Sequence, residues 1–239
     1  MHPVFLHSWE SIEYSGEAEI LPGNRYKRRM TDLQVAILAV FDKAKQTNPS
    51  LIESLIECPE SLFIFSSGLG EINTNSQITN SIVSGDYQIS PKNFHNSVYN
   101  GTAGYLTVSQ KFTNECLSIN DGYLSLDLSM QVAFNLIRSG QKRSILVISG
   151  HEHTNRDPLK ATAEILVFSS VTKTHSPIAK LVDIKRQNSK MPHKASRVQC
   201  FQEADQNGWA TFKMPSPDRP YRYVQDSSEQ GILSQWEAL

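Results

Sequence analysis

Residues 117–149 decide the fold of this chain, and they read LSINDGYLSLDLSMQVAFNLIRSGQKRSILVIS. We interpret them as a strand, a sharp turn at 120–123, a buried helix at 124–137 and a second strand at 144–149. In many enzymes a strand, a tight turn and a helix of this kind present a nucleophile at the mouth of an active site. The residue at the tip of this turn is not an obvious nucleophile, so the chemistry of the site has to be argued separately.

The helix in this stretch competes with a strand. Residues 124–132 alternate between apolar and polar types, and a period of two favours a strand. The alternation stops at 133–137, and Arg138-Ser139-Gly140 is typical of the end of a helix. We therefore predict a helix.

Composition excludes several classes of function. The chain has 239 residues, of which 20% are charged, and a net charge of −1, so no overall field favours nucleic acid or an anionic membrane. The N-terminus lacks the pattern of a secretory signal, and no apolar run is long enough to span a bilayer. Cys58, Cys116 and Cys200 are widely spaced, which indicates reduced thiols. We expect a cytoplasmic protein that binds neither nucleic acid nor membrane.

Hydrophobic periodicity outside this stretch predicts an α/β fold. Expected strands are 4–9, 61–66, 164–169 and 178–184, and expected helices are 31–45, 72–83 and 90–106. We predict one domain over residues 1–185. Residues 186–239 are expected to form a basic, loop-rich, irregular extension with a possible short strand at 209–212.

Several motifs resemble those of a known family. They are Ile89-Ser90-Pro91, Phe94-His95-Asn96-Ser97-Val98-Tyr99-Asn100, Ala103-Gly104-Tyr105 and Ser118-Ile119-Asn120-Asp121-Gly122. Together they resemble the N-terminal half of the β-ketoacyl synthases, over roughly residues 1–185. More narrowly, they are similar to short ketosynthase-like chain-length factors of Gram-negative type II polyketide and aryl-polyene systems. The resemblance implies a thiolase-like, layered α-β-α fold with one of its two halves present.

The resemblance also implies a catalytic residue that this chain lacks. Counting forward from Ala103-Gly104, or back from Arg138-Ser139-Gly140, places Tyr123 where the family has its nucleophilic cysteine. Condensation on a ketosynthase needs a thiolate to accept the acyl chain. A tyrosine with an ordinary pKa near ~10 does not replace it. We therefore interpret Asn120, Asp121, Gly122 and Tyr123 as a degenerate elbow in a subunit without catalytic activity.

Partners follow from the same resemblance. It implies a heterodimer with an active ketosynthase α subunit and an acyl carrier protein whose phosphopantetheine brings the substrate, with no cofactor or metal of its own. Candidates for the lining of the acyl tunnel are Ile78, Ile82, Phe94 and Tyr99, for which core packing is the competing explanation. Basic clusters at 25–29 and 185–197 are candidate contacts for the acidic carrier or the synthase.

Other residues offer alternative chemistry. Cys116 precedes the elbow, and His151 and His153 follow a predicted strand, so a free-standing acyltransferase or condensing enzyme that uses either remains open. Two histidines supply at most two metal ligands, which is too few for a typical zinc site. Asp121 is a candidate general base, but the turn itself also favours an Asp. A third alternative is an unrelated α/β binding module.

The short length leads to one further expectation. A single half of a thiolase-type fold should leave apolar surface exposed. We therefore predict an obligate heterodimer.

Overall fold

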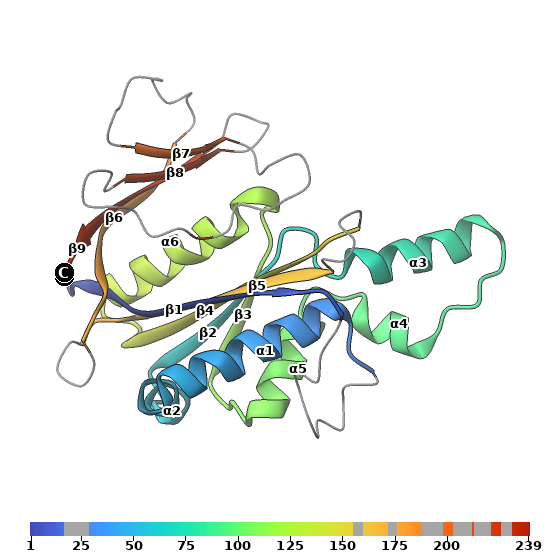
Figure 1. The fold of residues 1–239 in the computed structure, drawn as a ribbon, viewed down its shortest axis with the longest axis horizontal. Helices are drawn as coiled ribbons and strands as arrows, with labels where there is room; N and C mark the ends of the chain where they lie inside the picture. The colour runs from blue at the N-terminus through green and yellow to red at the C-terminus, as the bar shows by residue number, and fades with distance from the viewer. Residues whose placement is uncertain are drawn as a thin grey trace.

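The computed structural model describes residues 1–16, 29–154, 160–171, 176–187, 198–202, 212, 221–225 and 231–239 (Figure 1). They form a nine-stranded mixed sheet in the order β3-β2-β4-β5-β1-β6-β9-β8-β7. The strands are β1 (Val4–Tyr14), β2 (Ser61–Ser66), β3 (Glu115–Ile119), β4 (Ser144–Glu152), β5 (Ala161–Ser169), β6 (Ala179–Gln187), β7 (Val198–Gln202), β8 (Tyr221–Gln225) and β9 (Gly231–Ala238). The helices are α1 (Asp32–Thr47), α2 (Pro49–Glu57), α3 (Ile72–Val83), α4 (Pro91–Asn96), α5 (Gly101–Gln110), the 3-10 turn η2 (Gly122–Leu124) and α6 (Ser125–Arg138).

The sheet is parallel at one side and mainly antiparallel beyond β4. β2 is parallel to both β3 and β4, as expected for strands linked by helices. From β4 onward, β5, β1, β6, β9 and β8 are antiparallel to their neighbours, and β7 is parallel to β8. β3 is therefore the edge strand on the side of the parallel strands.

Two apolar cores lie on opposite faces of the sheet. The first contains α1, α2 and α5 packed on the sheet, with Phe41, Phe63 and Val167 almost completely buried. The second contains one face of α6, with Met130 and Phe134 buried against Val147 and Phe168. The parallel strands thus have helices on both faces, which gives the α-β-α layering that the sequence predicts.

The C-terminal strands give α6 a second cover. Figure 1 shows β6, β9, β8 and β7 curling over this helix, so that α6 lies between two parts of the same sheet. Ile232 and Trp236 of β9 belong to the same core as α6, and Phe212 packs edge-on against Trp236 with ring centroids 5.5 Å apart. The extension therefore buries one side of the helix that the parallel strands leave open.

Short local signals account for several boundaries. Thr31 and Gln34 form a complete capping box at the start of α1. Ser90 accepts a hydrogen bond from the Lys92 N–H and Pro91 occupies the first turn of α4. Gly140, with φ at 78°, follows α6 in the left-handed conformation that glycine adopts most easily.

Most sequence predictions of elements are confirmed, and two are wrong. The predicted helix at 124–137 is α6, so the broken alternation correctly outweighed the period of two. The single helix predicted at 90–106 is instead α4 and α5, because α4 ends where the Ser97 N–H donates to the Phe94 carbonyl and the next helix begins at Gly101. The extension predicted to be irregular contains β7, β8 and β9. Of the strand predicted at 209–212, only residue 212 is described, and it lies outside any strand.

The sheet also crosses the predicted domain boundary, since β6 runs through residue 185 and pairs with β9. The division into two domains stays a prediction. No helix in the described parts of the chain is both long and apolar enough to cross a membrane.

Apolar side chains exposed to solvent are concentrated in one part of the chain. Apart from Met1, Ile178 and Leu239, the large ones among the described residues lie between 69 and 117. They are Leu69, Ile82, Val83, Tyr87, Ile89, Phe94, Val98, Tyr99, Val108 and Leu117. We call residues 69–117 the apolar segment. Its helices α3 and α4, which we call the arm, project from the body at the right of Figure 1.

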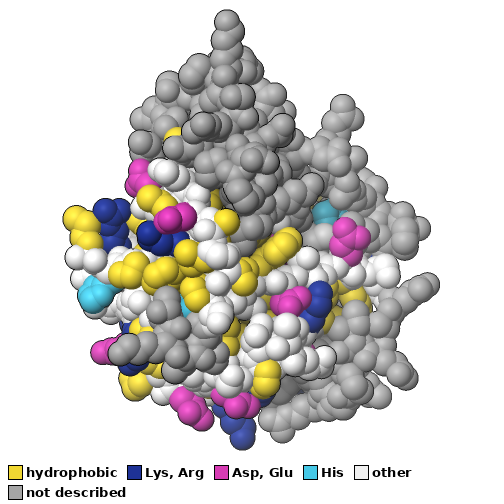
Figure 2. All heavy atoms as spheres, turned by 60° about the vertical axis from the view of Figure 1, so that its left-hand side comes forward, with side chains coloured by type: hydrophobic (Ala, Val, Ile, Leu, Met, Phe, Trp, Pro, Cys, Tyr) yellow, Lys and Arg dark blue, Asp and Glu magenta, His cyan; other side chains and the backbone are white. Residues whose placement is uncertain are grey.

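The opposite end of the molecule has a different surface. Figure 2 turns the left-hand side of Figure 1 forward, and basic, acidic and apolar side chains are intermixed on its described part. Mixed charge of this kind is typical of an ordinary solvated surface. Exposed apolar side chains in residues 69–117 therefore distinguish the arm and its surroundings from this end of the molecule.

Candidate functional site

The turn between β3 and α6 is fixed to the neighbouring strand by an asparagine. Asn120 Nδ2 donates to the backbone oxygens of Ser67 and Gly68, at 2.8 and 2.9 Å. These carbonyls belong to the loop that follows β2, and Gly70 in this loop has φ at 59°. The loop after β2 therefore holds the elbow in place.

A serine closes the elbow from within. Ser125 Oγ donates to the Gly122 carbonyl at 2.7 Å and accepts from the Asp121 N–H at 2.8 Å. Gly122 has φ at 52°, a conformation that other residues adopt at a cost. The backbone of Tyr123 lies in η2, and its side chain is outside the described part of the structure. The loss of the nucleophile at this position stays a prediction from the alignment of motifs.

The C-terminal strands also reach the elbow. Arg186 of β6 lies 3.4 Å from Asp121 Oδ2, and β8 contacts η2. Asp121 and Arg186 are about a third or more exposed, so the pair is a solvated salt bridge and contributes little to stability. The position of these strands matters more, because they lie over the point where a catalytic elbow would receive its substrate.

Cys116 is poorly suited to nucleophilic catalysis. Its side chain packs against the core of α1 and α5, whereas α6 belongs to the core on the other face. Burial raises the pKa of the Cys116 thiol to about 11. At neutral pH the thiol is protonated, and the thiolate is the nucleophilic form.

His151 and His153 are the other candidate catalytic groups, and burial also limits the chemistry of His151. His151 is 6% exposed, and burial together with the nearby His153 lowers the pKa of His151 to about 3. Its Nε2 lies 3.4 Å from Ser149 Oγ, and His153 Nε2 lies 3.3 Å from Thr162 Oγ1. His151 is therefore a neutral imidazole inside the protein. In the described residues, no group of three His, Cys, Asp or Glu side chains is arranged to hold a metal ion.

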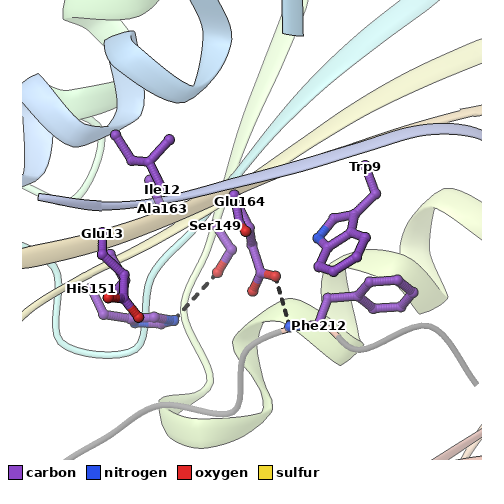
Figure 3. Close-up of a pocket in the computed structure, with 10 residues that line it drawn as sticks. Trp9, Ile12, Glu13, Ser149, His151, Ala163, Glu164 and Phe212 are labelled. Atoms are coloured by element: carbon purple, nitrogen blue, oxygen red, sulfur yellow. Dashed lines mark hydrogen bonds between the residues drawn. The ribbon is translucent and has the colours of Figure 1, made fainter. Parts of the chain in front are cut away.

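His151 contributes to a cavity of about 210 Å³ between β1, β4 and β5 (Figure 3). Trp9 and Phe212 stack edge-on at 5.6 Å along one side. Glu164 Oε2 accepts the Phe212 N–H at 2.7 Å. This contact ties residue 212 to the sheet beside α6.

Three of the residues predicted to line a tunnel lie in the arm, and the fourth, Tyr99, follows α4. Ile78 is partly buried, and Ile82, Phe94 and Tyr99 are 46%, 68% and 53% exposed. Core packing therefore does not explain the last three. Their role in a tunnel stays a prediction. The basic clusters lie largely outside the described residues, except that Arg29 is exposed and Arg186 pairs with Asp121.

Sequence reasoning missed a group of buried polar residues where the arm joins the body. We call Gln34, Glu71, Asn96, Thr102 and Glu152 the carboxyl hub. Gln34 was visible only as part of a capping box, and Glu152 only as the middle of His-Glu-His. These residues come from five separate segments, so no spacing along the sequence indicated that they meet.

Comparison with known proteins defines the class of protein. The family model described as β-ketoacyl synthase, N-terminal domain, matches residues 26–205. The chain belongs to this family, and its fold is the thiolase-like fold of ketosynthases, represented by the N-terminal half. The search of curated proteins gave no match.

Solved structures with similar folds are ketosynthases and their complexes. One is the ketosynthase ApeO in complex with its chain length factor ApeC from Xenorhabdus doucetiae, with a TM-score of 0.60 and 15% identity over 98% of this chain and 100% of that chain. Another is the ishigamide ketosynthase/chain length factor, with a TM-score of 0.71 and 9% identity over 99% of both chains. A third is the type II acyl-carrier protein complex AntDE:AntF, with its ketosynthase bound to the hexaketide, at a TM-score of 0.69 and 8% identity over 100% of this chain and 99% of that chain. At these identities the likeness establishes the fold alone.

Proposed function

We propose that the protein is a catalytically inactive chain-length factor of a type II polyketide system. It pairs with an active β-ketoacyl synthase and shapes the tunnel that holds the growing chain. The carrier protein of the complex brings the substrate on its phosphopantetheine, so this subunit needs no cofactor of its own.

The observation that carries the proposal is the apolar segment beside an open sheet edge. Among the described residues, β3 pairs with β2 alone, so backbone groups along its other edge are available to pair with another strand. Leu117 of β3, Val108 of α5 and Phe94 of α4 expose 36%, 66% and 68% of their surface. Exposed apolar side chains beside an unpaired strand edge are typical of a protein interface.

The elbow supports a role without catalysis. Its backbone geometry is retained through Asn120 and Ser125, but the motif alignment places Tyr123 where the thiolate is needed. Arg186 and β8 lie over the same turn. A subunit built in this way keeps the architecture of a ketosynthase and leaves the condensation to its partner.

The alternative of a free-standing acyltransferase or condensing enzyme has less support. Cys116 is held as a thiol by its raised pKa, and the lowered pKa of His151 makes it a poor proton carrier at neutral pH. Neither side chain lies on the elbow.

Labelling distinguishes these two functions. The purified chain is incubated with an acyl-loaded carrier protein, alone and with a type II ketosynthase as candidate partner, and covalent acylation is located by mass spectrometry. We expect acylation on the ketosynthase only, and full activity of the complex after Cys116→Ala. Acylation of this chain at Cys116, lost in the same variant, would establish the enzyme instead. A chain that neither binds the ketosynthase nor changes its products would contradict the proposed pairing.

Tunnel lining has its own test. Replacing Phe94 or Tyr99 by Ala is expected to lengthen the products of the complex, because the smaller side chain leaves more room for the chain. Val83, which is 81% exposed at the end of α3, provides a matched control, and Val83→Ala should leave product length unchanged. The same product length in all three variants would remove these residues from the tunnel.

A further inference from the structure

The carboxyl hub joins the arm to the body. Glu71 precedes α3, Asn96 ends α4, Thr102 begins α5, Gln34 lies in α1 and Glu152 ends β4. Their exposed fractions are between 1% and 5%. Helix starts and strand ends that are distant in sequence therefore meet in one buried polar cluster.

Most donors in this hub point at one carboxyl oxygen. Gln34 Nε2 donates to Glu71 Oε1 at 3.0 Å, and Thr102 Oγ1 donates to the same oxygen. Gln34 Nε2 also lies 3.3 Å from Asn96 Oδ1, while Asn96 Nδ2 donates to the Arg29 carbonyl at 3.0 Å. The amides thus tie the end of α4 directly to the start of α1, and Gln34 also ties α1 to Glu71.

Glu152, at the end of β4, accepts backbone N–H groups from the first turns of two helices. Its Oε2 accepts the Asn73 N–H of α3 at 2.9 Å, and its carboxyl also accepts the Leu33 N–H of α1. Helix N-termini carry unpaired N–H groups and a partial positive charge, so a negative charge is favourable at this position. These N–H groups favour the ionised form of Glu152, and burial and the charge of Glu71 oppose it more strongly.

The two carboxyl groups interact with each other. Glu71 Oε2 is buried and accepts no hydrogen bond from the residues that the structure describes, and the Glu71 carboxyl interacts with the Thr31 hydroxyl and with the carboxyl of Glu152. Two acceptor oxygens form a hydrogen bond only when a proton lies between them. One proton on the pair supplies a donor between the two carboxyl groups.

Surrounding charges favour retention of this proton. Burial and the charge of Glu71 raise the pKa of Glu152 to about 8, burial raises the pKa of Glu71, and Asp32 of α1 acts in the same direction. α3 and α5 contain no charged residues, and Lys92 and His95 of α4 are exposed.

Two other titratable groups near the hub stay neutral around pH 7. His151 of β4 is uncharged because its pKa is lowered to about 3. The pKa of Tyr14 is raised above its usual value by burial and by the nearby charge of Asp32. Among these groups nothing supplies a positive charge to replace the proton.

We propose that one proton shared by Glu71 and Glu152 clamps the arm to the body, and that its loss at alkaline pH releases the first turn of α3. Without the proton, two negative charges face each other in a buried site. Glu152 is held by two helix N-termini, whereas Glu71 lies in the loop after β2, so Glu71 is the one that moves outward. The first turn of α3 begins next to Glu71 and moves with it.

The consequence for partner binding rests on the proposed function. If the arm contributes to the ketosynthase interface, its position in the complex becomes dependent on pH. The clamp itself is a property of the isolated chain and is tested there without any partner.

Hydrogen exchange measured by mass spectrometry tests the clamp. In the full-length chain, exchange of peptides from α3 and α6 is compared at pH 6.5 and 9.0 after correction for the intrinsic rate at each pH. We expect protection of α3 to fall about tenfold or more at pH 9.0, and protection of α6 to stay the same. Equal protection of α3 at both values would overturn the proposal.

A variant that mimics the protonated state sharpens the test. Glu71→Gln keeps an oxygen for Gln34 and Thr102 and adds an N–H that can donate to Glu152. The pH effect on α3 should therefore disappear in this variant. Glu115→Gln, at an exposed site in β3, is the matched control and should behave like the wild type.

Persistence of the pH effect in Glu71→Gln would assign it to another group and contradict the clamp. If Glu71→Gln lacks the circular dichroism of the folded protein, Glu152→Gln replaces it, with the same expected loss of the pH effect and the same contradiction if the effect persists.

Discussion

α6 and the arm are both helical regions that carry apolar side chains. In the described structure, α6 is covered by the parallel strands on one side and by the C-terminal strands on the other, and the arm is not covered in this way. Met130, Phe134 and Ile137 of α6 are buried, since the parallel strands lie under them and Trp236 of β9 belongs to the same core. Phe94 and Tyr99 in and beside the arm have no such cover and remain more than half exposed. In the described part of the chain, the C-terminal strands thus cover α6, whereas apolar side chains in and beside the arm stay exposed.

The expectation that half of a two-part fold exposes apolar surface is therefore met in one place only. Residues 69–117 have such a surface, whereas α6 does not. This difference predicts that changes in the extension act on folding and changes in the apolar segment act on association.

The largest expected effect is a loss of stability when Trp236, which packs in the same core as α6, is replaced. Trp236 is 3% exposed, stacks against Phe212 and donates from Nε1 to Ser234 Oγ at 2.9 Å. Trp236→Ala should lower the free energy of unfolding by about 3–5 kcal/mol, measured by urea denaturation. Leu239→Ala, at a residue 64% exposed, should change it by less than about 0.5 kcal/mol. Similar stabilities for both variants would mean that the extension does not stabilise the body.

A second change should affect association and spare the fold. Leu117→Asp places a charge on the open edge strand, and we expect at least a ~30-fold weaker affinity for the ketosynthase, equivalent to about 2 kcal/mol. The unfolding midpoint of the isolated chain should change little, because Leu117 is 36% exposed. Ile178→Asp, at a 46% exposed site outside the apolar segment, is the control. Unchanged binding by Leu117→Asp would place the interface elsewhere.

The third prediction concerns His151 and Glu152, whose pKa shifts make the free energy of unfolding depend on pH in opposite directions. The pKa of His151 falls from 6.5 to about 3 on folding, so the unfolded chain binds more protons and stability decreases as the pH drops below 6.5. The pKa of Glu152 rises from 4.5 to about 8, so stability decreases as the pH rises through that range. Each slope is at most about 1.4 kcal/mol per pH unit.

The two slopes should largely cancel between pH 4.5 and 6.5 in the wild type. Glu152→Gln should then show stability that rises up to pH 6.5 and is flat above it, and His151→Gln should show stability that declines from pH 4.5 to 8. Denaturant titrations at each pH measure both curves. Variant curves parallel to the wild-type curve would assign the pH dependence to other residues.

The smallest effect is expected at the elbow. Arg186→Gln removes a salt bridge to Asp121 between side chains that are 42% and 33% exposed. The free energy of unfolding should fall by less than about 1 kcal/mol, and the change should diminish further in high salt. A loss of several kcal/mol would mean that the ion pair, and not the packing of the strands, holds the extension over η2.

Local signals predicted several elements of the body, but not α2 or the break between α4 and α5. The capping box at Thr31 and Gln34 and the turn at 120–123 act over a few residues, so they are visible in sequence. β9 was missed because Ser234, a polar residue, occupies an inward position between Ile232 and Trp236. The hydrophobic alternation of this strand is interrupted there, and its pairing with β6 spans about fifty residues of chain.

The sequence by itself determined the elbow, the helix that follows it and the family to which the chain belongs, because these depend on contiguous motifs. Only the tertiary structure decided that the C-terminal strands cover α6 and that Glu71 meets Glu152. Both result from contacts between segments far apart in sequence, where burial changes the chemistry of side chains. Residues 117–149 thus keep the architecture of an active site, while the regions packed around them determine what this surface can do.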